Sequence, residues 1–351
     1  MSTLEESIVE SAAHVLATYG LRATALESIT GGLINLTVSV ETADASQYVL
    51  QRLNPAFVPE VNLNLELVTR HLAAQGQATP RLVPALNGAW WVILDKTCWR
   101  LLTFVPGASF ATLPDARYAH AAGQLLGRFH RALATVAEPL PYRREPVHAP
   151  ARHFANLRHA LTQHAGHPLS AKVQSLAVAI AEASALLPPL AVHPLRLLHG
   201  DPKLSNLRFN ADASPGCMLD LDTLTAAPLA YELGDAFRSW CNPQPEDAVN
   251  ADFDLGLFSA AVEGYAEESR AFITRQERAS VVSATEMIYL ELAARFAADA
   301  VNESYFGWDA ARFATRGEHN LTRAQNQMAA AAALRAQRME AARCVRRVFE
   351  D

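Results

Sequence analysis

The chain has 351 residues, of which 50% are hydrophobic and 19% charged, and its formal net charge is −6. These values are typical of a globular protein and exclude a disordered or fibrous chain. A negative net charge also argues against a nucleic-acid-binding protein, which would carry a basic domain or stripe. An anionic ligand is still allowed, because local charge decides its binding.

The first residues and the cysteines bear on location. Residues 1–7 are acidic and lead into no long apolar stretch, whereas a signal peptide has a basic start and a continuous apolar segment. No apolar run approaches the length of a membrane span. The four cysteines share no metal-binding spacing, so we expect reduced thiols and a cytoplasmic protein without a membrane partner.

The first hundred residues indicate a small β-rich lobe. Apolar residues recur at helical spacing over residues 4–19 and again over 63–74. The first of these segments ends before Gly20, a residue that favours the end of a helix. Strand-like segments follow the predicted turns, at 25–30, 33–41, 47–53, 90–94 and 99–105. The pattern predicts an antiparallel β-sheet with one helix, and we expect this lobe to span residues 1–106.

Long segments rich in Ala and Leu follow, which indicates a second and mainly helical lobe over residues 107–351. Helical spacing is clearest over 116–133, 171–186, 280–300 and 323–348. The predicted fold class is therefore α+β, in two lobes.

The strongest chemical signal lies in a loop after a short apolar strand at 197–198. Asp201 comes first, Lys203 two residues later and Asn206 five residues later. Phosphoryl transfer needs these groups at this spacing: Asp201 to face the acceptor hydroxyl, Lys203 to screen the migrating phosphoryl group, and Asn206 to bind Mg²⁺. Alone, the sequence at 199–201 could equally be a turn.

A second apolar strand ends in Asp220 and Asp222 about a dozen residues later. Carboxylate oxygens are hard ligands that suit Mg²⁺ between the β- and γ-phosphates. Such a pair at a strand end is usually a solvated turn. In this order, downstream of a β lobe, the two motifs together indicate a kinase site that uses ATP and Mg²⁺.

These motifs resemble the aminoglycoside phosphotransferase/choline kinase superfamily, and further segments are similar to its N-acetylhexosamine 1-kinase branch. The segments lie at 48–54, 99–100, 220–223, 234–238 and 319–323, and the likeness runs from about residue 25 to about residue 330. The resemblance implies a bilobal protein-kinase-like fold and direct in-line transfer from ATP.

The resemblance also assigns the nucleotide-binding residues. Gly31 and Gly32, with Asn35 beyond them, sit where a phosphate-covering turn belongs. The family's strand cation is not a lysine here, because the third strand offers Gln51 and then Arg52. Alternation turns one of the two inward, and we expect the charged Arg52 to hold the phosphates.

Three further residues complete the predicted nucleotide site, and two more support the loop at 199–201. Glu66, on the following helix, would be the ion-pair partner of Arg52. Phe104 and Val105 would form the hinge that meets adenine. Asp235 resembles the family's buried Asp that braces the loop at 199–201, with His199 as a supporting residue in that loop.

For the acceptor, the resemblance implies Lys203, Arg295 and Tyr305, with Arg238 as a weaker candidate. Glu303 and Ser304 replace the Gly-Asp that usually precedes the tyrosine, so the resemblance does not identify the sugar. Further arginines on these segments favour a neutral or anionic acceptor over an aminoglycoside, and they are Arg312, Arg316 and Arg323. A choline or ethanolamine site would need an aromatic cage, for which Trp240, Tyr305, Phe306 and Trp308 are available.

We therefore expect a small-molecule kinase whose partners are ATP and a hydroxyl acceptor, most similar to a sugar or N-acetylhexosamine kinase, as a monomer or homodimer. Aminoglycoside and choline or ethanolamine phosphotransferases are the alternatives among enzymes. A catalytically silent nucleotide-binding pseudokinase is the alternative from another class, since the usual strand lysine is missing.

Overall fold

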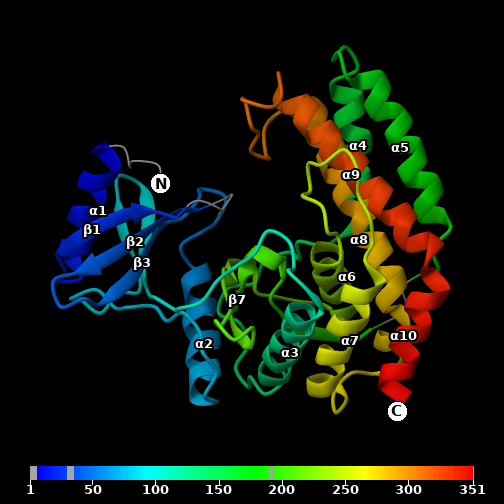
Figure 1. Cartoon of the computed structure of the whole chain (residues 1–351). Coiled ribbons are helices and arrows are strands. Elements are labelled where there is room, and N and C mark those ends of the chain that lie inside the picture. The colour runs from blue at the N-terminus through cyan, green and yellow to red at the C-terminus, as the bar shows by residue number, and fades with distance from the viewer. Residues whose placement is uncertain (1–5, 30–34, 190–192, 351) are drawn as a thin grey trace.

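The computed structural model describes residues 6–29, 35–189 and 193–350, and a β-sheet and a helical assembly divide most of them (Figure 1). The first elements are α1 (Glu6–Thr18), β1 (Ala23–Ser28), β2 (Leu36–Thr42), β3 (Gln47–Arg52), α2 (Val61–Ala74), β4 (Val92–Leu94) and β5 (Thr97–Thr103). The five strands pair antiparallel in the order β1-β2-β3-β5-β4. The predicted sheet is confirmed.

The two faces of this sheet have different partners because side chains alternate along each strand. One face packs against α1, through Val38, Val40, Leu50, Trp99 and Leu101. The opposite face lines a cleft, through Thr37, Val49, Gln51, Arg100 and Leu102. Alternation thus separates an apolar core from a functional surface within the same strands.

Most of the buried apolar residues of helix α2 belong to the core of the helical part. Its buried residues Leu65, Val68 and Leu72 pack in the same apolar cluster as α3 and α7. In Figure 1, α2 stands between the sheet and the rest of the molecule. Helix α2 is therefore anchored in the helical core and also contributes to the lining of the cleft, through Leu65.

The remaining described chain forms most of the helices, two short strand pairs and two single-turn 3₁₀ helices. The elements are α3 (Ala116–Leu133), α4 (Pro150–Gln163), α5 (Ser170–Ala185), β6 (Leu195–Leu198), η1 (Leu204–Asn206), β7 (Leu207–Phe209), β8 (Pro215–Met218), η2 (Leu221–Thr223), β9 (Thr225–Pro228), α6 (Leu229–Trp240), α7 (Leu255–Ser269), α8 (Arg275–Asn302), α9 (Arg316–Ala336) and α10 (Arg338–Glu350). Strand β6 pairs with β9, and β7 pairs with β8. The α+β class is confirmed.

The expectation of one helix over 323–348 is wrong at both ends. Helix α9 begins earlier, because the Thr315 side chain accepts a hydrogen bond from the Glu318 N–H and caps its first turn. It ends at Ala336, Gln337 separates it from α10, and α10 continues to Glu350. In the part of the chain that the structure describes, no helix is long and apolar enough to cross a membrane.

The segment after β5 is tied to β7, and we propose the lobe boundary, between residues 106 and 107, inside it. Ala108 and Phe209 exchange backbone hydrogen bonds of 2.9 and 2.8 Å. Gly107 has φ +123°, and a Cβ there would lie 2.6 Å from the Phe209 carbonyl oxygen. Only glycine fits both the conformation and the space. The linker is therefore fixed in one position relative to β7.

We predict that Gly107→Ala lowers the free energy of unfolding more than Gly88→Ala, measured by urea unfolding. Both glycines have positive φ, but nothing lies within 4 Å of a Cβ built at Gly88. The control variant should therefore show only the backbone strain, about 1–2 kcal/mol. The clash at Gly107 should add roughly 1–3 kcal/mol. Equal losses in the two variants would contradict the tight linker packing.

Candidate active site

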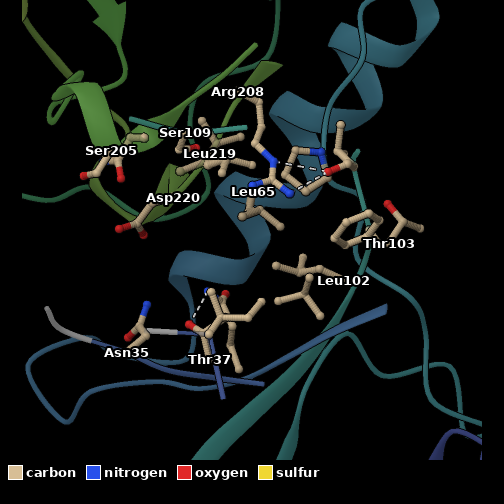
Figure 2. Close-up of a pocket in the computed structure, with 18 of the residues that line it drawn as sticks. Asn35, Thr37, Leu65, Leu102, Thr103, Ser109, Ser205, Arg208, Leu219 and Asp220 are labelled. Atoms are coloured by element: carbon tan, nitrogen blue, oxygen red, sulfur yellow. Dashed lines mark hydrogen bonds between the residues drawn. The ribbon is translucent and has the colours of Figure 1, made fainter. Parts of the chain in front are cut away.

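A cleft of about 540 Å³ lies between the sheet and the loops around β7 and β8 (Figure 2). Polar residues line part of it: Asn35, Thr37, Gln51, Arg100, Lys203, Asn206 and Asp220. Apolar residues line the rest, among them Ile29, Val49, Leu65, Leu102, Phe104, Val105 and Leu219. The cleft thus offers groups for a polar ligand part and walls for an apolar one.

Strand β6 delivers the predicted catalytic loop, and a buried carboxylate fixes its backbone. The two carboxylate oxygens of Glu232 accept hydrogen bonds from the His199 and Gly200 N–H groups, at 2.8 and 2.7 Å. Gly200 has φ +86°, and a Cβ there would lie 2.4 Å from the Thr223 carbonyl oxygen. The loop therefore packs closely between α6 and the segment that carries Asp220.

Glu232 has the bracing role that the sequence suggested for Asp235, so that assignment is wrong. Both lie on α6, three residues apart and hence on the same side of the helix. Burial alone would raise the pKa of Glu232, but a hydrogen bond and charge from His130 outweigh it and lower the pKa. Glu232 stays an ionised acceptor. Its helical spacing from Asp235 was the only signal in the sequence.

The predicted catalytic residues lie together. The Lys203 ammonium is 2.6 Å from an Asp201 carboxylate oxygen, and the Asn206 amide nitrogen donates to the Asp201 carbonyl at 2.8 Å. Burial would lower the pKa of Lys203, but Asp201 and Asp220 outweigh it and raise the pKa. The lysine is therefore a permanent cation beside Asp201.

His199 links this loop to the next strand. Its Nε2 donates to the Leu219 carbonyl at 2.7 Å, and its Nδ1 accepts from the Asp201 N–H at 3.3 Å. The Leu219 N–H in turn donates to the Asn206 carbonyl at 2.8 Å. These bonds hold the loop and the segment before Asp220 as one unit.

Asp220 and Asn206 fit a hard divalent cation. Asp220 has left-handed backbone angles, φ 57° and ψ 59°, which are uncommon for a residue other than glycine. Burial and the neighbouring Asp222 raise the pKa of Asp220 to about 7, as is typical of a carboxylate that needs a counter-cation. The Asn206 amide nitrogen faces Asp201, so its oxygen is available to a metal ion.

Asp222 does not have the metal-binding role that was predicted for it, because other side chains bind its carboxylate. The Arg100 guanidinium from β5 binds both of its carboxylate oxygens, at 2.5 and 3.0 Å, and the Asn35 amide donates to it at 2.9 Å. Arg100 is 0% and Asp222 2% exposed. The pair is a buried bidentate bridge between the sheet and the segment after Asp220, which leaves Asp222 unsuited as a metal ligand.

The Arg100 guanidinium is saturated. Its remaining donors reach the Gln51 side-chain oxygen, at 2.9 and 2.7 Å, and the Asn62 side-chain oxygen, at 3.1 Å. A guanidinium has five N–H donors, and each has an acceptor here. The sequence motif at 99–100 was noted only as a family likeness, and nothing in it pointed to Asp222 as the partner.

Arg52 does not face the cleft, so the prediction that it holds the phosphates is wrong. Its guanidinium lies over the Trp99 ring, 5.8 Å from the ring centre, on the α1 side of the sheet. Gln51 faces the cleft instead and pairs with Arg100 across the ladder. Glu66 lies 3.6 Å from Arg81, so its predicted pairing with Arg52 is also wrong.

Asn35, Phe104 and Val105 line the cleft, where the nucleotide was expected. Besides its bond to Asp222, the Asn35 side chain accepts from the Asn54 N–H at 2.9 Å. Gly31 and Gly32, the predicted phosphate-covering turn, lie outside the described residues. Their role stays a prediction.

Asp235 forms a buried charge cluster next to the catalytic loop. Its carboxylate accepts from Arg238 at 2.8 and 3.0 Å and lies 3.5 Å from His148. Arg238 also binds Glu246, at 3.1 Å, and is buried. It is thus an internal counter-ion, and the prediction that it contacts the acceptor is not supported. His148 further contacts Glu291, at 3.0 Å.

The other two acceptor candidates share one aromatic cluster. The Arg295 guanidinium lies 5.7 Å from the Phe306 ring centre, and the Tyr305 ring meets Phe306 edge-on at 4.8 Å. Tyr305 is 61% exposed. The Asp299 carboxylate accepts from the backbone N–H groups of this loop, those of Ser304, Tyr305 and Phe306. An acceptor role for Arg295 and Tyr305 stays a prediction.

We predict that Asp222→Asn lowers the free energy of unfolding by about 3–5 kcal/mol, because the buried Arg100 loses its counter-charge. The double variant Arg100→Met/Asp222→Leu should cost clearly less than the sum of its two single changes. The same cycle on the exposed pair Arg70 and Glu138, 3.6 Å apart, should give about 0–1 kcal/mol of coupling. Additive losses at Arg100 and Asp222 would contradict a coupled bridge.

We predict that His148 makes stability depend on alkaline pH. Burial would lower its pKa, but Asp235 and Glu291 outweigh it and raise the pKa from 6.5 to about 10. The folded protein then holds a proton that the unfolded chain releases, so this stabilisation is complete below pH 6.5 and is lost as the pH rises toward 10.

The measurement is urea unfolding on both sides of this pH range, with His148→Gln and, as a control, the exposed His14→Gln. The wild type and the control should lose stability as the pH rises, on the order of a few kcal/mol from this group. The His148→Gln protein should lose less. An unchanged slope in that variant would contradict a charged His148.

The sequence and the fold were compared with known proteins. A model of the phosphotransferase enzyme family, APH, matches residues 25–269. Among solved structures, a microcompartment-associated aminopropanol kinase superposes with a TM-score of 0.63, at 17% identity, over 95% of this chain and 98% of its own.

Two further structures share the fold. The amicoumacin kinase hAmiN, in complex with AMP-PNP, Ca²⁺ and Ami, has a TM-score of 0.62 and 14% identity over 93% of both chains. A choline/ethanolamine kinase family protein from Mesorhizobium loti has a TM-score of 0.58 and 17% identity, over 97% of this chain and 99% of its own. These identities establish the fold, and the family model covers more than half of the sequence. The chain therefore belongs to the phosphotransferase enzyme family.

Proposed function

We propose that the protein transfers the γ-phosphoryl group of ATP, with Mg²⁺, to a hydroxyl group of a small molecule. The observation that carries the proposal is the group formed by Asp201, Lys203 and Asn206 on one braced loop, with Asp220 on the neighbouring segment that is hydrogen-bonded to this loop. The order and contacts of these residues match what in-line phosphoryl transfer requires. Membership of a family of phosphotransferases supports it.

Each residue of this group has a distinct task in the proposal. Asp201 orients the acceptor hydroxyl and takes its proton, and the adjacent Lys203 offsets negative charge on the transferred group. Asn206 and Asp220 would hold Mg²⁺, which would neutralise charge on the phosphate oxygens. Gln51 and Arg100 keep Asp222, and with it the backbone after Asp220, in place. Asp201, Asn206 and Asp220 are all present, which does not favour a silent pseudokinase.

The acceptor is proposed to be a sugar, in the first place an N-acetylhexosamine, held by Arg295 and Tyr305. The support is the sequence likeness together with the rigid loop that presents Tyr305. The argument from further arginines weakens, because Arg312 pairs with Asp247 and the other two bind backbone carbonyls. Amino alcohols are the second candidate class, since the folds above include aminopropanol and choline/ethanolamine kinases.

One part of the choline alternative is not supported. Trp240 is fully buried and its indole N–H donates to the Pro202 carbonyl, so it cannot join an aromatic cage. Tyr305 and Phe306 remain available for such a cage. We place the enzyme in the cytoplasm as part of the same proposal.

We predict that Asp201→Asn lowers kcat by about 10²–10⁴-fold and leaves ATP affinity nearly unchanged, because Asp201 acts on the acceptor hydroxyl. The assay is turnover with an accepted substrate, alongside an ATP titration. Asp212→Asn, in the exposed turn before β8, is the matched control and should behave like the wild type. Turnover of Asp201→Asn close to that of the wild type would rule out this role.

The acceptor class is tested by a turnover screen against N-acetylhexosamines, neutral sugars, aminoglycosides, choline, ethanolamine and aminopropanol. We expect the highest kcat/KM with an N-acetylhexosamine. Tyr305→Phe should then raise KM for that sugar, because the phenol hydroxyl is lost while the ring stays. A clear preference for an amine-bearing acceptor would contradict the sugar assignment and leave the phosphotransfer itself in place.

A further inference from the structure

Arg208 places a positive charge among the apolar residues of the cleft. It comes from β7, two residues after Asn206, and its Nε and Nη2 donate to the Val105 carbonyl at 3.3 and 3.2 Å. Its guanidinium also lies 5.6 Å from the centre of the Phe104 ring. Figure 2 shows Arg208 reaching toward the linker, on the side where Leu102 and Thr103 lie. The bonds to Val105 place its donors where we expect the nucleobase.

The position of Arg208 is fixed by both of its neighbours. The Leu207 carbonyl accepts from the Ser109 hydroxyl at 2.7 Å, and Phe209 exchanges two backbone bonds with Ala108. Strand alternation then turns Arg208 to the face opposite the buried Leu207 and Phe209, which is the cleft. A shift in the register of β7 would break these bonds. The Arg208 guanidinium therefore has a fixed position in the wall of the cleft.

Arg208 offers hydrogen-bond donors on this wall of the cleft. A guanidinium has N–H groups and no acceptor, and within residues 6–29, 35–189 and 193–350 the structure gives Arg208 only the Val105 carbonyl as a hydrogen-bond partner. The N–H groups of Nη1 are therefore left for a ligand. The Val105 carbonyl accepts from Arg208 on one side, and its second lone pair can still accept the 6-amino group of adenine.

Guanine complements such a wall better than adenine does. Its O6 and N7 are two adjacent acceptors, which an arginine can bind with two N–H groups, whereas adenine presents a donor at N6 beside N7. We propose that Arg208 contacts the nucleobase and that the cleft binds guanine nucleotides as well as adenine nucleotides. This rests on the proposed function, since it takes the cleft as a nucleotide site.

The test is equilibrium titration of ATP and GTP with Mg²⁺, without any acceptor, on the full chain. The wild type should bind GTP within about tenfold of its ATP affinity. Arg208→Leu should weaken GTP binding by about tenfold or more, the range of one two-point arginine contact, and change ATP binding much less. Arg208→Lys should also lose GTP affinity, because an ammonium lacks the planar fork.

Arg70→Leu, an exposed arginine on α2, is the matched control and should leave both affinities unchanged. Thermal unfolding of Arg208→Leu and Arg208→Lys checks that either variant is folded. GTP binding more than a hundredfold weaker than ATP binding in the wild type would overturn the proposal. Equal loss of both nucleotides in the folded variants would also overturn it. If neither nucleotide binds the wild type, the proposed kinase function itself fails.

Discussion

The ion pair between Arg100 and Asp222 is the constraint on which the rest of the site depends. It joins β5 of the sheet to the turn after Asp220, and both side chains are buried. Burying two charges is costly, and their attraction compensates only when every remaining donor and acceptor is satisfied. Gln51, Asn62 and Asn35 supply those contacts. The pair is therefore better understood as a device that fixes geometry than as a source of net stability.

Fixing that geometry decides which carboxylate faces the cleft. With Asp222 held by the sheet, the left-handed backbone at Asp220 turns its side chain toward Asn206 and Lys203, where all three line the cleft. The sheet is thus connected to the helical part through a charge on β5, whereas the family resemblance suggested a charge on β3 that would hold the phosphates. Glu232 has the corresponding role for the catalytic loop, because its carboxylate accepts hydrogen bonds from the backbone of that loop.

Much of this could be predicted from the sequence, because strand alternation, helical spacing and the loop motif are local signals. The sheet, most helices and the cluster of Asp201, Lys203 and Asn206 followed from them. Alternation also showed that one of Gln51 and Arg52 faces inward, but charge was the wrong criterion for choosing between them. The choice depends on Arg100, which lies opposite Gln51 on a strand 49 residues away in sequence. Pairings across such distances leave no trace in local patterns.

We propose that Asn206 and Asp220 bind the metal ion while Asp222 remains bound to Arg100. A crystal structure with a non-hydrolysable ATP analogue and Mn²⁺, in which the anomalous signal locates the metal, tests it directly. We expect Mn²⁺ within bonding distance of oxygens from Asn206 and Asp220, with the bridge between Arg100 and Asp222 intact. Mn²⁺ bound by Asp222, with the Arg100 guanidinium released onto the phosphates, would contradict it.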